Sequence, residues 1–200
     1  MPPSRDAWSS AFAMQSRSDW QVYDRLAAEP QISACHELHY LQMACEKIAK
    51  AYRCRDTAAN LEELLTRHAG FTKFMGSFLA SPSLKEAYRG RDAQRREVAK
   101  LARALAREIE KLAPAIDRAA SPENAEYPWQ SGENIVAPCQ YDYPQLSLLT
   151  SAGGRTFLKL VARAIEEFEP APIPSRAPRL NKGPGATPPI TAEKTPTPPD

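Results

Sequence analysis

Apolar residues recur along most of the chain at intervals of three and four, the spacing of one face of an α-helix. This periodicity predicts helices within residues 4–28, 32–53, 60–79, 84–112 and 154–169. Pro30 ends the first of them, because proline lacks a backbone N–H and its ring clashes with the preceding turn. Asn60 is predicted to cap the third helix, and Gly70 allows a kink or break within it.

The stretch between the fourth and fifth predicted helices, residues 121–151, has no clear period. Its aromatic residues indicate that it packs across the helices, and residues 134–137 are its only short β-like run. We therefore predict an all-α fold. The architecture is a four- to five-helix up-and-down bundle with an irregular crossover before the last helix.

Proline is concentrated at the end of the sequence, where residues 170–200 hold ten of the 19 prolines and few large apolar residues. Such a segment buries too little surface to compensate for the entropy lost on ordering. We expect two parts: a helical bundle over residues 1–169 and a disordered proline-rich tail over residues 170–200.

The charge balance and the cysteines exclude several classes of protein. Residues 1–169 carry 22 basic and 22 acidic side chains, so no basic field extends over the whole protein. No apolar run exceeds four residues, which predicts no membrane contact and a cytoplasmic location. The four cysteines form no C-x-x-C pair, so we expect neither a metal centre nor a redox motif.

Two groups of polar residues are candidates for binding a ligand. The second predicted helix carries a ridge, called here the second-helix ridge, formed by Gln42, Glu46, Lys47 and Lys50. Its lysines are able to hold a phosphate or a partner carboxylate, although Glu46 and Lys50 also have the spacing of an ordinary surface pair. Gln42 falls on the apolar side and is expected to bond a neighbouring helix or Asp19.

The fourth predicted helix carries the second group, called here the basic rail: Arg96, Lys100, Arg103 and Arg107. These residues project from one side of the helix, opposite a predicted apolar stripe that includes Val98, Leu101 and Leu105. A row of this kind suits a phosphate backbone, and it is also compatible with a solvated helix face.

The histidines do not form a recognisable catalytic group. His36 and His39 lie three positions apart, but a metal needs further ligands that this helix does not supply. His68 lies on an apolar face and is expected to be a hydrogen-bonded core residue. No spacing in the sequence predicts a catalytic centre.

The first two predicted helices share an ordered set of residues: Ser18, Asp19, Trp20, Gln42, Ala44, Glu46, Lys47 and Lys50. This order resembles the HEPN domain, a nucleotide-binding helical domain of prokaryotes and higher eukaryotes. The match covers roughly residues 8–54, and the later helices fit it in number and polarity.

The resemblance implies a dimeric bundle that acts beside RNA or nucleotides. Members of this family are ribonucleases or partners of small nucleotidyltransferases in toxin–antitoxin or defence systems. The nuclease members carry an arginine followed four to six residues later by a histidine. None of His36, His39 and His68 follows an arginine at that distance, so the sequence indicates a protein without ribonuclease activity.

These observations lead to one main hypothesis and two alternatives. We expect a non-catalytic, HEPN-like homodimer without a cofactor, which binds a nucleotide, an RNA or a nucleotidyltransferase-type protein through the second-helix ridge. One alternative is a protein-interaction scaffold that uses the bundle and the aromatic crossover, with the tail as a tether. The other is a divergent ribonuclease, which rests on family analogy alone.

Overall fold

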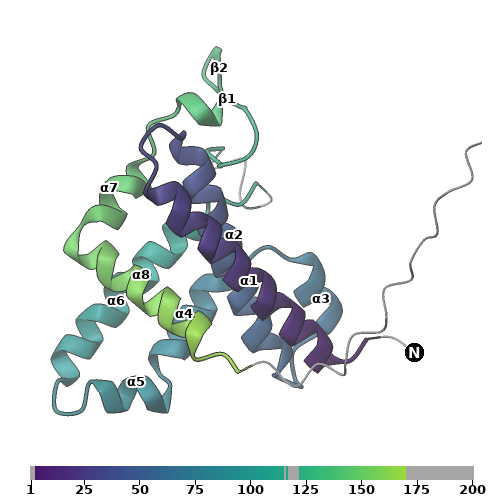
Figure 1. Ribbon diagram of the computed structural model, residues 1–200, viewed down its shortest axis with the longest axis vertical. Helices are drawn as coiled ribbons and strands as arrows, with labels where there is room; N and C mark the ends of the chain where they lie inside the picture. The colour runs from purple at the N-terminus through teal and green to yellow at the C-terminus, as the bar shows by residue number, and fades with distance from the viewer. Residues whose placement is uncertain (1–2, 115, 117–121, 170–200) are drawn as a thin grey trace, which may run out of the picture.

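The computed structural model describes residues 3–114, 116 and 122–169, so the predicted disordered tail lies outside the described residues. The described chain is a helical bundle with one small hairpin of strands at its end (Figure 1). Its elements are α1 (Arg5–Ala27), α2 (Ala34–Cys54), α3 (Leu61–Thr66), α4 (Phe71–Leu79), α5 (Pro82–Ala87), α6 (Asp92–Glu110), β1 (Trp129–Ser131), β2 (Asn134–Val136), the 3-10 turn η1 (Pro138–Gln140), α7 (Pro144–Thr150) and α8 (Ala152–Glu166).

Helices α1 and α2 form a closely packed hairpin. Small residues of α1 face α2, and two of them bond directly to its backbone. Ser9 Oγ donates to the Ala51 carbonyl oxygen at 2.8 Å, and Ser16 Oγ donates to the Ala44 carbonyl oxygen at 2.7 Å. These hydroxyl groups are buried, and the bonds give each a partner that compensates for its lost water.

The third and fourth predicted helices are each divided in two. Asn60 caps α3 as predicted, since its side chain accepts from the Glu63 N–H at 3.2 Å. The first division is at Gly70, which has φ +136°, and the second is at Gly90, which has φ +73°. Glycine adopts positive φ without the strain that a Cβ atom would cause, so it allows the chain to change direction at both points.

The crossover between α6 and α8 contains structure that the periodicity did not predict. β1 and β2 pair antiparallel, with Gln130 opposite Ile135, and α7 follows them. The β-like run at residues 134–137 is therefore a strand within a hairpin. The expected packing of the aromatic residues is confirmed at Tyr143, which is 2% exposed and donates to the Asn124 carbonyl oxygen at 2.8 Å.

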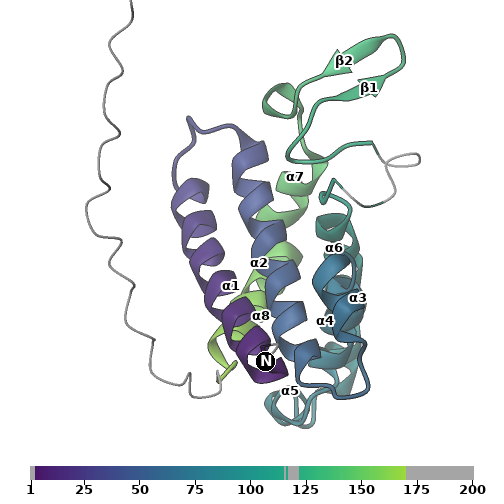
Figure 2. The same ribbon diagram turned by 90° about the vertical axis from the view of Figure 1, so that its right-hand side faces the viewer.

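Helix α2 lies at the centre of the core. Its side chains Leu38, Leu41 and Ile48 are fully buried, and α1, α3, α4, α6 and α8 all pack against it. Figure 2 shows α1 beside α2 and α6 on the other side of α2, with the β-hairpin beyond one end of the bundle and α5 at the other. Within the described ranges, no helix combines the length and the apolar character that crossing a membrane requires.

One detail of the core differs from the sequence-based expectation. On α6 the buried positions are Ala102, Leu105, Ala106 and Ile109, whereas Leu101 is 39% exposed. The buried face is therefore turned toward the two alanines, whose small side chains let α6 approach α4 and α8. Of the four cysteines, three are buried and only Cys139 is exposed, and none of them forms a disulfide.

Candidate functional site

The second-helix ridge is largely buried, and its charged groups are paired with one another. Glu46 Oε1 lies 2.9 Å from Lys50 Nζ, and Gln42 Nε2 donates to Glu46 Oε2 at 3.0 Å. The side chains of Glu46 and Lys50 are only 10% and 9% exposed. Gln42 therefore bonds within its own helix, and the expectation that it bonds a neighbouring helix or Asp19 is wrong.

His68 completes this cluster from the loop between α3 and α4. Its Nδ1 lies 3.2 Å from Glu46 Oε1, while half of its side chain is exposed. The expectation of a core histidine on an apolar helix face is wrong, because α3 ends at Thr66 and His68 lies in a loop. The structure thus brings Gln42, Glu46, Lys50 and His68 together around one carboxylate.

Lys47 leaves the ridge and binds the first helix instead. Its Nζ lies 2.5 Å from Asp19 Oδ2, and Gln15 Nε2 donates to Asp19 Oδ1 at 2.9 Å. This pair connects α1 to α2 in a mostly buried setting. Every charged side chain of the second-helix ridge therefore has an internal partner of opposite sign, which a bound ligand would have to displace.

The other histidines of α2 do not assemble a metal site. His39 Nδ1 lies 3.4 Å from Glu126 Oε1, and His36 is exposed at the first turn of the helix. In the described part of the chain, no three His, Cys, Asp or Glu side chains come together in a way that would hold a metal ion.

The basic rail has the opposite character, because its four side chains are exposed and none is paired with a carboxylate in the described part of the chain. No ion pair among the described residues involves Arg96, Lys100, Arg103 or Arg107. Most of the acidic residues within residues 85–111 interact with groups outside the rail. Four of the five have other partners: Glu86 with Arg89, Asp92 with Arg95, Glu108 with Lys111, and Glu110 with the first turn of α4.

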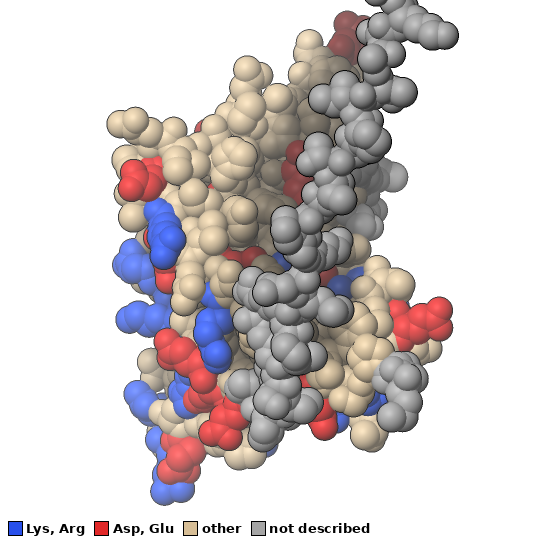
Figure 3. Space-filling model, turned by 45° about the vertical axis from the view of Figure 1, so that its right-hand side comes forward, with Lys and Arg blue, Asp and Glu red and all other residues tan. Residues whose placement is uncertain are grey.

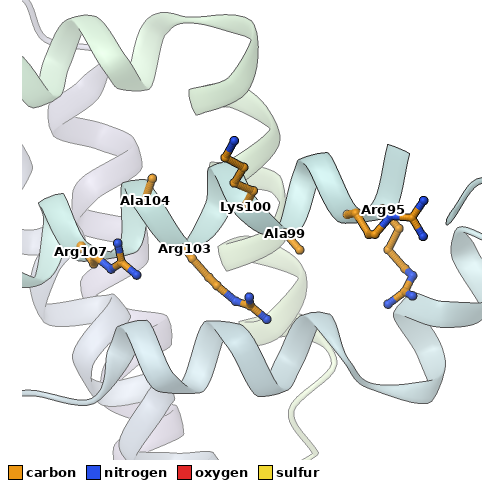
Figure 4. A pocket seen from close by; sticks show the side chains of 7 residues that line it. Arg95, Ala99, Lys100, Arg103, Ala104 and Arg107 are labelled. Carbon is orange, nitrogen blue, oxygen red and sulfur yellow. The ribbon is translucent and has the colours of Figure 1, made fainter. Parts of the chain in front are cut away.

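The basic rail lines a shallow hollow of about 560 Å³ together with Arg95 and two alanines. Figure 4 shows Lys100 and Arg103 leaving α6 on opposite sides. Arg103 lies over α4 at Gly76, where a Cβ atom would come within 3.3 Å of Arg103 Nε. Gly76 therefore makes room for the guanidinium group, which the sequence alone did not reveal.

The charge of the rail is local and not part of a general basic surface. On the face shown in Figure 3, basic and acidic side chains are mixed along one side, and the upper part is mostly uncharged. Over residues 85–111 the sequence has nine basic and five acidic side chains. Three of these acids pair with Arg89, Arg95 and Lys111 of the same stretch, so the net excess of four positive charges is left to the other residues, which include the rail.

Comparison with known proteins adds no further constraint. No protein-family model, no curated protein and no solved structure matches this chain. The chemistry of the site therefore follows from its own residues.

Proposed function

We propose that this protein binds the phosphate backbone of nucleic acid, RNA in the first place, through the basic rail of α6, without cleaving it. The observation that carries the proposal is a row of four exposed cations with no carboxylate partner among the described residues, lining one hollow. The row spans residues 96–107, which at 1.5 Å per residue is about 17 Å of helix. That length suits several successive phosphates and exceeds what one small anion needs.

The composition of the hollow supports binding without cleavage. All its polar side chains are arginine or lysine, which stay protonated near neutral pH and provide no general base. The second-helix ridge is a weaker candidate, because Glu46 neutralises Lys50 and Asp19 neutralises Lys47. The resemblance to the HEPN domain agrees with an RNA-associated role, and we extend the proposal to a cytoplasmic homodimer on that resemblance alone.

The test is the affinity for a short labelled single-stranded RNA, measured by fluorescence anisotropy at several salt concentrations. We expect Arg96→Glu with Arg103→Glu to weaken binding and to reduce the log–log salt slope by about 0.7 for each phosphate that the variant no longer neutralises. The matched control is Arg25→Glu with Arg67→Glu. It changes the net charge equally at two exposed arginines on α1 and just after α3.

The control separates a specific site from a general effect of charge. Under the proposal, the rail variant binds RNA much more weakly than the control, and both keep the helical circular dichroism spectrum of the parent. Equal reductions in affinity would mean that RNA responds only to total charge. An unchanged affinity and slope in the rail variant would show that the rail is an ordinary solvated face.

A second candidate function is protein interaction through the crossover, and one observation favours it. Ile135 is 72% exposed on β2 of the hairpin that projects from the bundle, and Tyr127, two residues before β1, is 54% exposed. Exposed apolar side chains on a projecting element are common at protein interfaces. Loss of a co-purifying protein in Ile135→Asp, with RNA affinity unchanged, would assign that role to the hairpin.

A further inference from the structure

A second hollow, separate from the basic rail, lies where the end of α2 meets α3 and α4. Its volume is about 680 Å³, and its lining includes Tyr52, Asp56, Asn60, Phe74, Ser77 and Phe78. We call it the aromatic groove. It has an aromatic floor and a polar rim, and neither the second-helix ridge nor the basic rail contributes to it.

The floor of the aromatic groove is a stack of rings. The centroids of Tyr52 and Phe74 are 5.0 Å apart, and those of Phe74 and Phe78 are 5.7 Å apart. The phenylalanines are nearly buried, whereas Tyr52 is half-buried. This arrangement presents one accessible ring on a rigid apolar base.

The end of the described chain lies beside this groove. Tyr52 packs against Phe168 with ring centroids 5.0 Å apart, and its hydroxyl donates to the Ala164 carbonyl oxygen at 3.1 Å. The guanidinium of Arg55 lies 3.9 Å from the centre of the Phe168 ring and also donates to the carbonyl of Glu169. Tyr52 therefore belongs both to the wall of the groove and to the point where the described chain ends.

A second contact near the groove involves the C-terminal end of α8. Ser81 lines the groove at the start of α5, and Ser83, two residues later, donates to Glu167 Oε2 at 3.3 Å. The chain that follows Glu169 thus starts at the edge of the groove. A tethered segment that starts there has a high effective concentration at the site, which compensates for weak intrinsic affinity.

The sequence after Glu169 has the composition that aromatic grooves bind. Residues 170–182 contain four prolines, three basic residues and no acidic residue. Proline-rich segments dock in grooves lined by aromatic rings because their restricted backbone loses little entropy on binding. The rim supplies Asp56 and Glu63 for the basic residues, although Arg53 and Lys73 also line the groove.

From this geometry we infer that residues 170–182 of the same chain occupy the aromatic groove. An extended proline-rich segment advances about 3.1 Å per residue, so ten residues reach about 31 Å from Glu169. That reach is ample for a groove whose wall contacts Phe168. The inference does not depend on RNA binding, because no residue of the basic rail lines the groove.

The test uses the full chain with a nitroxide spin label on Ser175→Cys. The background is Cys139→Ser, because Cys139 is the exposed cysteine and the other three are buried. We expect selective loss of amide NMR intensity at Asn60 and Ser77, on two sides of the groove. Replacing Pro172, Pro174 and Pro178 by serine should restore that intensity.

A matched control removes three prolines from the far end of the tail, Pro196, Pro198 and Pro199, and should leave the broadening unchanged. Uniform weak broadening over the whole surface would overturn the inference. A mixture of isotope-labelled protein with spin-labelled, unenriched protein tests for a second copy. Broadening in that mixture equal to the intramolecular effect would also overturn it, since the occupant would then belong to another molecule.

Discussion

The first turn of α4 takes its cap from a distant helix, and removing that cap gives the sharpest test of the fold. The Glu110 carboxylate on α6 accepts from three successive backbone N–H groups, those of Gly70 at 2.5 Å, Phe71 at 2.7 Å and Thr72 at 3.5 Å. Its other oxygen accepts from Thr72 Oγ1 at 2.8 Å. Gly70 has no side chain to provide a cap of its own, so Glu110 takes that role.

The expected magnitude follows from these contacts. A helix cap contributes about 0.5 to 2 kcal/mol, and a hydrogen bond to a charged group about 1.5 to 3 kcal/mol. Glu110 is only partly buried, so after substitution water replaces some of the bonds that the carboxylate made. We expect Glu110→Ala to lower the free energy of unfolding by about 2 to 3 kcal/mol. Glu110→Gln keeps an acceptor oxygen and should cost about half as much.

Equilibrium unfolding in urea, followed by circular dichroism, measures the effect. For a chain of this size, the expected change corresponds to a fall in melting temperature of about 5 to 10 °C. The control is Glu108→Ala on the same helix, which removes only a half-exposed pair with Lys111 and should cost less than about 0.5 kcal/mol. If both variants were destabilised by the same small amount, Glu110 would not be the cap of α4.

Three further predictions concern buried groups. Glu46→Ala should lower the free energy of unfolding in urea by about 3 to 5 kcal/mol, because it leaves Lys50 buried without its carboxylate. The double variant Glu46→Leu with Lys50→Met should lower it by less, and an equal loss in both variants would refute the pairing argument. Gly154→Ala should cost about 3 kcal/mol, because its Cβ would overlap backbone carbonyl oxygens of α7, while Gly153→Ala meets only a movable leucine side chain and should cost clearly less. Burial raises the pKa of Tyr143, so above about pH 10 the unfolded state loses a proton that the folded state keeps, and stability falls by up to about 1.4 kcal/mol per pH unit. Between pH 9 and 11 the free energy of unfolding of Tyr143→Phe should fall less steeply with pH than that of the parent protein. Identical slopes in the two proteins would contradict the raised pKa of Tyr143.

Local signals in the sequence predicted the helices well, because those signals act over a few residues. Asn60 before an apolar repeat was enough to locate the start of α3, and Gly70 marked a division. The division at Gly90 was missed, since one glycine in a polar stretch resembles a tolerated helix position. Of the hairpin around Gly132 only the β-like run at residues 134–137 was noted, because its strands have only three residues each.

The chemistry of the candidate sites was harder to predict, because it depends on interactions between distant residues. Periodicity placed Glu46 and Lys50 on a polar side of α2. That side is covered in the fold, with the Phe12 ring centre 5.5 Å from Lys50 Nζ and His68 bonded to Glu46. Periodicity also placed the basic rail on exposed positions of α6, although Lys100 and Arg103 leave the helix on opposite sides (Figure 4). Most of the acidic residues near the rail have other partners. One of them, Glu110, binds the first turn of α4, and no local sequence pattern reveals that contact.

The α1–α2 hairpin affects how the protein folds while it is being synthesised on the ribosome. Its contacts lie within the first 54 residues, so they close short loops and can form as soon as this part emerges. The α2 side chains that α8 later covers must wait for about 100 more residues, which takes about 5 to 20 s at ordinary rates of synthesis. During that interval the nascent chain displays an apolar helix face. Slowing translation between residues 55 and 157 should therefore lengthen the time in which chaperones engage it.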